Sequence, residues 1–383
     1  MTAPEPGFDI PARPGDPVSA VATPALVIDL DAFEANLARM ADHAARLGVR
    51  LRAHAKTHKS ADIAQAQVQS GATGICCQKV SEALALIRGG VRDVLIANEV
   101  VAPRAIALLM RAASRARVAV CADHPANVAA LSAAVMAARA EGAEALTLEV
   151  LVEVDTGAGR CGVAPGAEAV TLAQAIHDAP GLRLGGIQAY HGNAQHIYDP
   201  AERARVLDAS IRAAAATRDA LLAAGLPCPR VTGAGTGSFA IEAASGVYTE
   251  IQAGSYVFMD ADYARVADPE GGVTGGFEQA LFVLATVMST PVPGRAVCDA
   301  GLKALAVDSG LPLVAAPAGV TYRGASDEHG TLDDPDGVLA LGDQVRLIPG
   351  HCDPTCNLHD WYVCIRRGKV EALWPVTARG KLF

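Results

Sequence analysis

The sequence predicts an α/β chain with two domains, a (β/α)8 barrel of the TIM type followed by a mainly β C-terminal domain. From about residue 24 to about residue 240, short runs of β-branched residues alternate with alanine-rich helical stretches. Repeated βα units imply parallel strands joined by helical crossovers, and eight such units suggest a closed barrel. After about residue 265, strand-like runs replace the helical pattern. An open doubly wound sheet is the alternative, because a miscount of one or two units would leave the barrel open.

The eight units follow one another with short connections. Their predicted strands are residues 25–30, 49–54, 73–77, 93–98, 117–123, 146–155, 182–190 and 229–235. We therefore divide the chain into residues 1–22, a proline-rich segment that packs on the β domain, residues 23–264, which form the barrel, and residues 265–383, which form the β domain. In such a barrel the active site lies at the C-terminal ends of the strands.

Composition excludes several classes of function. Hydrophobic residues make up 51% of the 383 residues, which fits a globular protein, and no apolar run reaches membrane-spanning length. The N-terminus has no secretory pattern. The net charge of −9 and the lack of a basic tract argue against nucleic acid as a partner. Nine scattered cysteines indicate reduced thiols, so we expect a cytoplasmic protein with neither membrane nor nucleic acid as a partner.

The stretch LRAHAKTHKS, residues 51–60, contains two histidines and two lysines. Side chains alternate between the two faces of a strand, so His54, Lys56 and His58 share one face and Lys59 lies on the other. The polar face would point into the barrel, which makes Lys56 the candidate for an interior amine and Lys59 a surface residue at a helix start. Neighbouring cations would lower the pKa of an interior amine, and a neutral amine can form a Schiff base. A solvated polar corner is the alternative.

The loop GAGTGS, residues 233–238, follows the last predicted strand. Glycines let the backbone approach a ligand closely, and successive amides with hydroxyls can hold a phosphate. The segment FAIEAASG would open a helix whose N-terminus favours an anion. A tight βα loop without a ligand is the alternative. Together, an interior lysine and a phosphate loop indicate pyridoxal phosphate, which offers one aldehyde and one phosphate.

The segment GHCDPTCNLHDWY, residues 350–362, carries possible metal ligands. In an extended segment His351 and Asp353 share a face, while Cys352 points away. An imidazole and a carboxylate completed by water suit Mn²⁺, Mg²⁺ or Zn²⁺. A zinc site made of Cys352, Cys356 and His359 is a weaker hypothesis, because C-x₃-C has no second cysteine pair. A turn with satisfied polar groups is a further alternative.

Taken together, these motifs resemble a known family. The segments are RAHAKTHKS, GICCQKVSEA, VDTGAGRCGV, IQAYHGNAQH, GAGTGS, EIQAGSYVFMDADY, DEHG and HCDPTCNLHD. From about residue 20 onward, the chain resembles the D-threonine aldolase and D-serine dehydratase group, within the alanine-racemase-like (fold type III) pyridoxal-phosphate enzymes. The resemblance implies a barrel followed by a β domain, and a homodimer whose active site lies between the barrel and β domains.

The resemblance also implies roles for individual residues. Lys56 would hold the cofactor through its amine, Arg160 would face the pyridine nitrogen, and Tyr190 would pack near the ring. The implied cofactor-binding residues are Lys56, Arg160, Tyr190, Gly235, Thr236, Gly237, Ser255 and Tyr256. His351 and Asp353 would bind a divalent metal, which makes Mn²⁺ or Mg²⁺ the expected ion and Zn²⁺ the alternative.

The implied reaction is the metal-assisted cleavage of a D-β-hydroxy-amino acid. The substrate amine would displace Lys56, the metal would lower the pKa of the β-hydroxyl, and loss of its proton would break the Cα–Cβ bond. The products would be glycine and an aldehyde. His191 and His196 are the candidates for the base, and each could equally be a hydrogen-bonded residue at the barrel mouth, as could His58.

Several substrates fit this reaction. D-threonine, which gives acetaldehyde, is the nominal one. A close alternative is 3-hydroxyaspartate, which gives glyoxylate, because VDSGLP and HCDPTCNLHDWYV resemble that branch. A D-serine dehydratase is the third possibility. The resemblance to that branch implies the pattern H-x-C at the metal site, whereas this chain has an aspartate, Asp353, at the third position, which is a harder ligand than a thiolate. A non-catalytic carrier of pyridoxal phosphate resembles the barrel alone, and the β domain with its metal motif argues against it.

Overall fold

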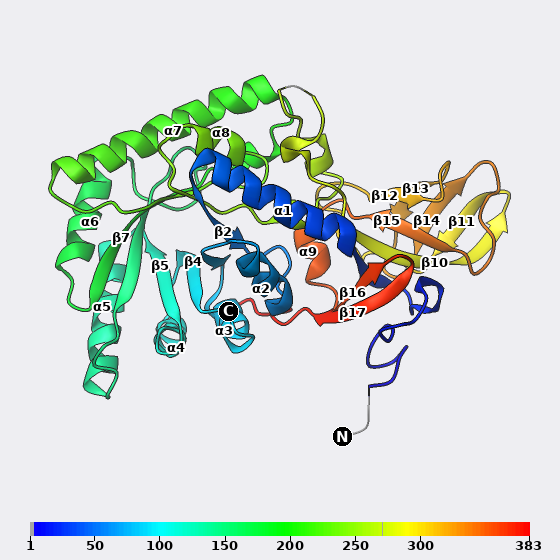
Figure 1. Ribbon diagram of the computed structural model, residues 1–383, viewed down its shortest axis with the longest axis horizontal. Helices are drawn as coiled ribbons and strands as arrows, with labels where there is room; N and C mark the ends of the chain where they lie inside the picture. The colour runs from blue at the N-terminus through cyan, green and yellow to red at the C-terminus, as the bar shows by residue number, and fades with distance from the viewer. Residues whose placement is uncertain (1–3, 270) are drawn as a thin grey trace.

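A computed structural model describes residues 4–269 and 271–383. Its first part is a closed barrel of eight parallel strands, β2 to β9 in chain order, and its second part is a separate β sheet (Figure 1). The barrel strands are β2 (Arg50–His54), β3 (Gly74–Cys77), β4 (Asp93–Glu99), β5 (Arg117–Ala122), β6 (Leu148–Glu153), β7 (Leu182–Ala189), β8 (Val231–Gly233) and β9 (Glu250–Ile251). The predicted fold class, a (β/α)8 barrel followed by a mainly β domain, is confirmed.

One predicted barrel strand lies elsewhere. Strand β1 (Ala25–Asp29) joins the β domain, where it pairs antiparallel with one strand and parallel with another. The barrel is instead closed by β9, which pairs with both β8 and β2. The prediction was wrong at this point because β1 is buried on both faces, which gives it the continuous apolar pattern of a barrel strand. Strand β9 has two residues, which are too few to show a pattern.

Helices cover the outside of the barrel. They are α1 (Leu30–Leu47), α2 (Ala61–Gln69), α3 (Val80–Arg88), α4 (Pro103–Ala113), α5 (Pro125–Ala140), α6 (Ala167–Asp178), α7 (Pro200–Ala223) and α8 (Phe239–Ala244). Helix α1 leads from β1 into the barrel. Asp29 caps its start with a carboxylate that accepts hydrogen bonds from the first turn, and Gly48 follows its end with a φ of 67°, a conformation that glycine adopts without strain. The helix buries one face, which includes Phe33 and Met40.

The β domain has one sheet of nine strands, which includes β1. Its other strands are β10 (Leu281–Val292), β11 (Gly294–Cys298), β12 (Leu313–Ala316), β13 (Thr321–Ala325), β14 (Gly330–Asp334), β15 (Gln344–Ile348), β16 (Trp361–Arg366) and β17 (Lys369–Pro375). The short helix α9 (Cys352–Cys356) lies between this sheet and the barrel (Figure 1). The N-terminal segment runs along β17, where the Gly15 amide donates to the Val370 carbonyl at 2.8 Å.

The interior of the barrel is filled below its mouth. At the N-terminal ends of the strands, Arg52 donates to Asp93 at 2.6 Å and to Glu250 at 3.0 Å, and Arg230 pairs with Glu149. Above these ion pairs lies an apolar layer made of Cys76, Leu95, Ala97, Ala119, Cys121 and Leu151. Ligands can therefore reach the barrel only from the C-terminal ends of the strands.

Two further observations concern membrane-spanning helices and disulfides. No helix in residues 4–269 and 271–383 is both long enough and apolar enough to span a bilayer. The nine cysteines all lie in these ranges, and none of them forms a disulfide.

Candidate active site at the barrel mouth

Lys56 lies at the junction of the two domains. It follows β2 in a tight turn, its side chain is 42% exposed, and its Nζ lies 3.5 Å from Asp353 Oδ2 on α9. Burial, the largest single cause, would lower the pKa of this amine, but Asp353 and Tyr190 together more than offset burial, and the pKa is raised. The expectation of a lowered pKa is therefore wrong, because the nearest charge is the Asp353 carboxylate, an anion, rather than a cation.

Two other polar residues of the HAKTHK stretch, Lys59 and His58, are buried and bonded to neighbouring groups. Lys59 was expected at the surface, but its side chain is 10% exposed and donates to Glu82 at 2.8 Å. His58 is buried, with one ring nitrogen 3.2 Å from Gln67 and the other accepting from the Ser60 amide at 3.1 Å. Burial lowers the pKa of His58 to about 4. The strand alternation ends at Ala55, where the backbone turns, so the later residues do not follow it.

The glycine loop between β8 and α8 packs tightly against its neighbours. The Gly237 amide donates to Gln195 at 3.0 Å, and the Gly235 amide donates to Ser238 at 3.0 Å. The amide of Thr236 has no acceptor among the described residues, so it is available to an anion. A Cβ on Gly237 would lie 2.6 Å from a main-chain oxygen, which explains the glycine.

The segment after β9 connects this loop to the lysine turn. The Tyr256 amide donates to Thr236 Oγ1 at 3.0 Å, and the Tyr256 hydroxyl accepts from Gln67 at 3.3 Å, so the phenol lies in the core. Ser255 Oγ lies 3.5 Å from Thr57 Oγ1 and 3.4 Å from Asp353 Oδ1. Contacts of this length are weak, which leaves the Ser255 hydroxyl free to bind a ligand.

Arg160 and Tyr190 form a second wall of the mouth. The guanidinium of Arg160 lies over the ring of Tyr190, 5.7 Å from its centroid. Arg160 is exposed, on the loop after β6, and Tyr190 follows β7. Both contribute to the electrostatic field at the Lys56 amine. The structure thus brings Lys56, Arg160 and Tyr190 to the same mouth.

The two candidate base histidines differ in their surroundings. His191 is 7% exposed, its Nδ1 has no partner among the described residues, and burial lowers its pKa. Its Nε2 lies under Gly157, in the loop that carries Arg160. His196, in contrast, is 46% exposed, and its Nδ1 lies 2.5 Å from the buried carboxylate of Asp262.

The predicted metal pair flanks the start of α9. His351 precedes the helix and Asp353 lies in its first turn, so the segment is helical there rather than extended as expected. The Nδ1 of His351 lies 2.7 Å from Asp308 Oδ2. In the neutral tautomer with the proton on Nδ1, this contact would leave Nε2 to offer a lone pair to a metal. Burial alone would lower the pKa of His351, but Asp353 and Asp308 raise it.

The alternative zinc site does not assemble. Cys352 and Cys356 are buried, and His359 Nε2 is 2.7 Å from the Ala304 carbonyl. Across residues 4–269 and 271–383, the one group of three possible ligands within 4.8 Å of one another consists of Glu99, Asp123 and Cys161. Glu99 is the last residue of β4, Asp123 comes directly after β5, and Cys161 lies on the loop after β6.

Sequence reasoning missed the carboxylates that support these groups. Asp308 holds His351, and Asp262 holds His196 and also accepts from Tyr198 at 2.6 Å. These partners are far apart in the chain, so spacing gives no signal for them. The one sequence signal for Asp262 is its place in the acidic segment MDADY, residues 259–263, and that segment does not indicate a histidine partner.

Comparisons with known proteins identify the family of the chain. The alanine racemase N-terminal domain family matches residues 28–262, and a serine dehydratase domain family matches residues 280–365. Over 381 residues the chain is 51% identical to the 3-hydroxy-D-aspartate aldolase of Paracoccus denitrificans (strain Pd 1222), covering 98% of this chain and 97% of that protein. Over 372 residues it is 49% identical to the D-threonine aldolase of an Arthrobacter species, covering 97% and 96% respectively.

A solved structure supports the same relationship. The crystal structure of D-threonine aldolase from Filomicrobium marinum matches with a TM-score of 0.93 and 48% identity, covering 97% of this chain and all of the other. Both the barrel and the β domain are therefore shared with this protein. The chain belongs to the family of the D-threonine and 3-hydroxy-D-aspartate aldolases, which are carbon–carbon lyases built on the alanine racemase barrel.

Proposed function

We propose that this protein cleaves D-β-hydroxy-amino acids to glycine and an aldehyde, with pyridoxal phosphate and a divalent metal as cofactors. One observation carries the proposal: a partly exposed amine, Lys56, lies 3.5 Å from the carboxylate of a potential metal ligand, Asp353. An amine that binds the cofactor and a metal that binds the β-hydroxyl must lie this close, because both act on one small substrate. The metal would lower the pKa of the hydroxyl.

The barrel mouth fits pyridoxal phosphate. The Lys56 amine is accessible, the Thr236 amide and the Ser255 hydroxyl are free for a phosphate, and the Tyr190 ring and Arg160 form a wall beside them. When bound, the cofactor supplies an electron sink for the carbanion formed at Cα. The role of the protein is to fix its two ends, with the amine at one end and the loop from Gly235 to Gly237 at the other.

The metal would be held by His351 and Asp353. The donors are one imidazole nitrogen and carboxylate oxygens, a hard set that favours Mn²⁺ or Mg²⁺ over Zn²⁺. Asp308 orients the imidazole, as outer carboxylates commonly do for metal-bound histidines. Because Lys56 now shares the Asp353 carboxylate, a bound cation would compete with the amine for it and favour the neutral amine.

We assign the base to His196 rather than His191. Its contact with Asp262 orients the ring and leaves Nε2 free, and its exposure of 46% lets a substrate or a water molecule reach it. Asp262 would also stabilise the charged ring after proton transfer. His191 instead lies buried under the loop of Gly157, so its role is to support the loop that carries Arg160.

Two substrates are consistent with the family. D-threonine is the nominal one and 3-hydroxy-D-aspartate is the alternative, because relatives named for each reaction are almost equally identical to this chain, at 49% and 51%. Dehydration is disfavoured by the ligand Asp353, since the resemblance to the dehydratase branch calls for a thiolate at that position. We also infer a cytoplasmic homodimer from the family resemblance, with the D-amino acid as its small-molecule partner.

The test is to identify the aldehyde by mass spectrometry. The protein would receive pyridoxal phosphate, Mn²⁺ and a mixture of D-threonine and both D-3-hydroxyaspartate diastereomers. A dominant acetaldehyde signal assigns D-threonine, and dominant glyoxylate assigns the hydroxyaspartate. The absence of both aldehydes would refute the proposed cleavage. A Lys56→Ala variant is the control, because aldehyde formation that survives this substitution does not come from the proposed site.

A further inference from the structure

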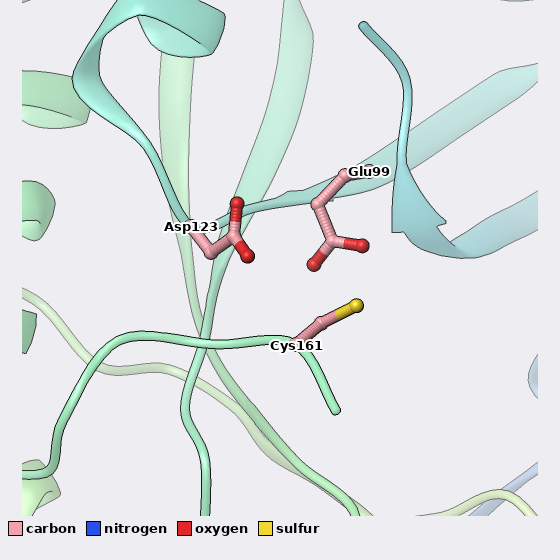
Figure 2. A group of neighbouring side chains, drawn as sticks. All are labelled: Glu99, Asp123 and Cys161. Carbon is pink, nitrogen blue, oxygen red and sulfur yellow. The ribbon is translucent and has the colours of Figure 1, made fainter. Parts of the chain in front are cut away.

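A second group of ligand-type side chains lies across the barrel mouth. Glu99 ends β4, Asp123 follows β5, and Cys161 lies on the loop after β6. Each offers one ligand atom, and these atoms all lie within 4.8 Å of one another. Figure 2 shows the two carboxylates and the thiol directed toward one space. The group comes from three different segments, so chain proximity does not explain it.

A fourth acidic side chain is buried beside this group. Glu153 ends β6, is 4% exposed, and its Oε2 has no hydrogen-bond partner among the described residues. In the register of β5 and β6, Ala122 pairs with Val152, so Asp123 and Glu153 are the next neighbours across the two strands. Leu151 belongs to the barrel interior, and the alternation of the strand places Glu153 on the same inner face.

These groups need compensation. The Oε1 atom of Glu99 is also buried without a partner, so two carboxylate oxygens in one place lack a donor. Buried carboxylates are costly unless a cation or protons neutralise them. Arg160 partly opposes the raised pKa values of Glu99 and Glu153, but its guanidinium lies over the ring of Tyr190 and forms no ion pair with either carboxylate among the described residues.

We propose that Glu99, Asp123 and Cys161 bind a second divalent cation, with Glu153 behind them as a further oxygen donor. A thiolate together with carboxylates favours a borderline cation such as Zn²⁺ over Mn²⁺ or Mg²⁺. The two metal positions of the chain would therefore differ in chemistry, with a hard N/O set at His351 and Asp353 and a softer S/O set here.

The loop that carries Cys161 also carries Arg160. The Gly162 amide already donates to Asp123 Oδ2 at 3.1 Å, so the loop is fixed to β5 on one side of the thiol. A cation on Cys161 would fix the other side and would hold Arg160 at the mouth. This consequence rests on the proposed cofactor role of Arg160, whereas the cation site itself does not.

The test separates this site from the first one. In the full chain loaded with pyridoxal phosphate, His351→Ala and Asp353→Asn together remove the first metal position. The protein is stripped with a chelator, and Zn²⁺ per chain is then measured by equilibrium dialysis with elemental analysis. Cd²⁺ is a second probe, because its bond to a thiolate gives an ultraviolet charge-transfer band. We expect one Zn²⁺ per chain and a cadmium–thiolate band in this background.

Variants then identify the ligands. Adding Cys161→Ala should abolish the band and weaken Zn²⁺ binding at least tenfold, since even outer partners of a metal site contribute about 10–100-fold. Glu99→Gln should weaken binding and keep the band. Cys228→Ala is the matched control, because Cys228 is the other partly exposed cysteine. The proposal is overturned if the background binds no Zn²⁺, since protons then neutralise the carboxylates, or if Cys161→Ala changes binding no more than Cys228→Ala does. Neither result affects the aldehyde assay.

Discussion

Replacing Lys59 by methionine should destabilise the protein by about 3 kcal/mol and leave cofactor binding intact. The ammonium of Lys59 lies 2.8 Å from Glu82 Oε1, and the two side chains are only 10% and 2% exposed. At this distance, with an effective dielectric constant of about 20, the gross attraction is about 6 kcal/mol. Desolvation offsets part of it, and breaking a buried pair typically costs about 3–5 kcal/mol.

The lower end of that range applies here. Glu82 Oε2 also accepts hydrogen bonds from the Gln78 and Lys79 amides, both at 3.0 Å, so the carboxylate keeps two donors when Lys59 is lost. Lys56→Met is the matched comparison, because that lysine is three residues away and its carboxylate partner is at 3.5 Å. Its side chain is 42% exposed, so solvent screens the pair and less than about 1 kcal/mol is lost.

The assay is urea unfolding of the cofactor-free proteins, followed by circular dichroism, so that cofactor binding does not contribute to stability. With an m-value of about 3 kcal/mol/M, the midpoint of Lys59→Met should fall by about 1 M and that of Lys56→Met by much less. Borohydride reduction with pyridoxal phosphate, followed by mass spectrometry, should label Lys59→Met and not Lys56→Met. An unchanged midpoint in Lys59→Met, or loss of labelling in that variant alone, would refute the assignment of the two lysines.

Three further predictions concern the metal, the phosphate loop and pH. Asp308→Asn should weaken Mn²⁺ binding about 10–100-fold, measured by metal titration of activity, because it releases the ring of His351. Gly237→Ala should weaken pyridoxal phosphate binding at least tenfold in a fluorescence titration, since its Cβ would lie 2.6 Å from a main-chain oxygen, while Gly324→Ala, with open space around it, should not. Burial raises the pKa of Glu242 to about 7 from its ordinary 4.5, so its contribution favours folding below pH 4.5 and is lost as pH rises to 7. Between pH 4.5 and 7, the free energy of unfolding of Glu242→Gln, measured by urea unfolding, should therefore rise by about 3 kcal/mol relative to that of the parent. If the two proteins show the same pH dependence of stability, the raised pKa of Glu242 is wrong.

The alternation of side chains holds only within β2, which ends at His54, so it does not reach Lys56 or the residues after it. Strand β2 runs directly to the barrel mouth, so a period of two holds up to that point. From Ala55 onward the chain turns, and Lys59 has a φ of 50°. A positive φ is uncommon in residues other than glycine, so the sequence pattern gives no signal for it. The periodicity therefore could not show that Lys59 lies in the core with a partner on α3.

The partners of the site residues were beyond sequence reasoning for a different reason. Asp308 and His351 are 43 positions apart, and His196 and Asp262 are 66 apart, so only the folded chain brings them together. Motif spacing can point only to groups that are close in the chain, such as His351 and Asp353, whose role as metal ligands stays a prediction. It does not identify contacts between segments that are far apart in the chain, even when both lie in the same domain.

Strand β1 has a consequence for how the protein is made. Its residue Leu26 pairs with Val283 on one side and with Tyr362 on the other, so the strand is synthesised early but completed by segments that leave the ribosome hundreds of residues later. Until then, an apolar strand with two open edges is exposed to association with other chains. A gene fragment that ends after the barrel would leave that strand permanently exposed. The barrel of this enzyme should therefore not be obtainable as a separate soluble product unless residues 25–29 are removed with the β domain.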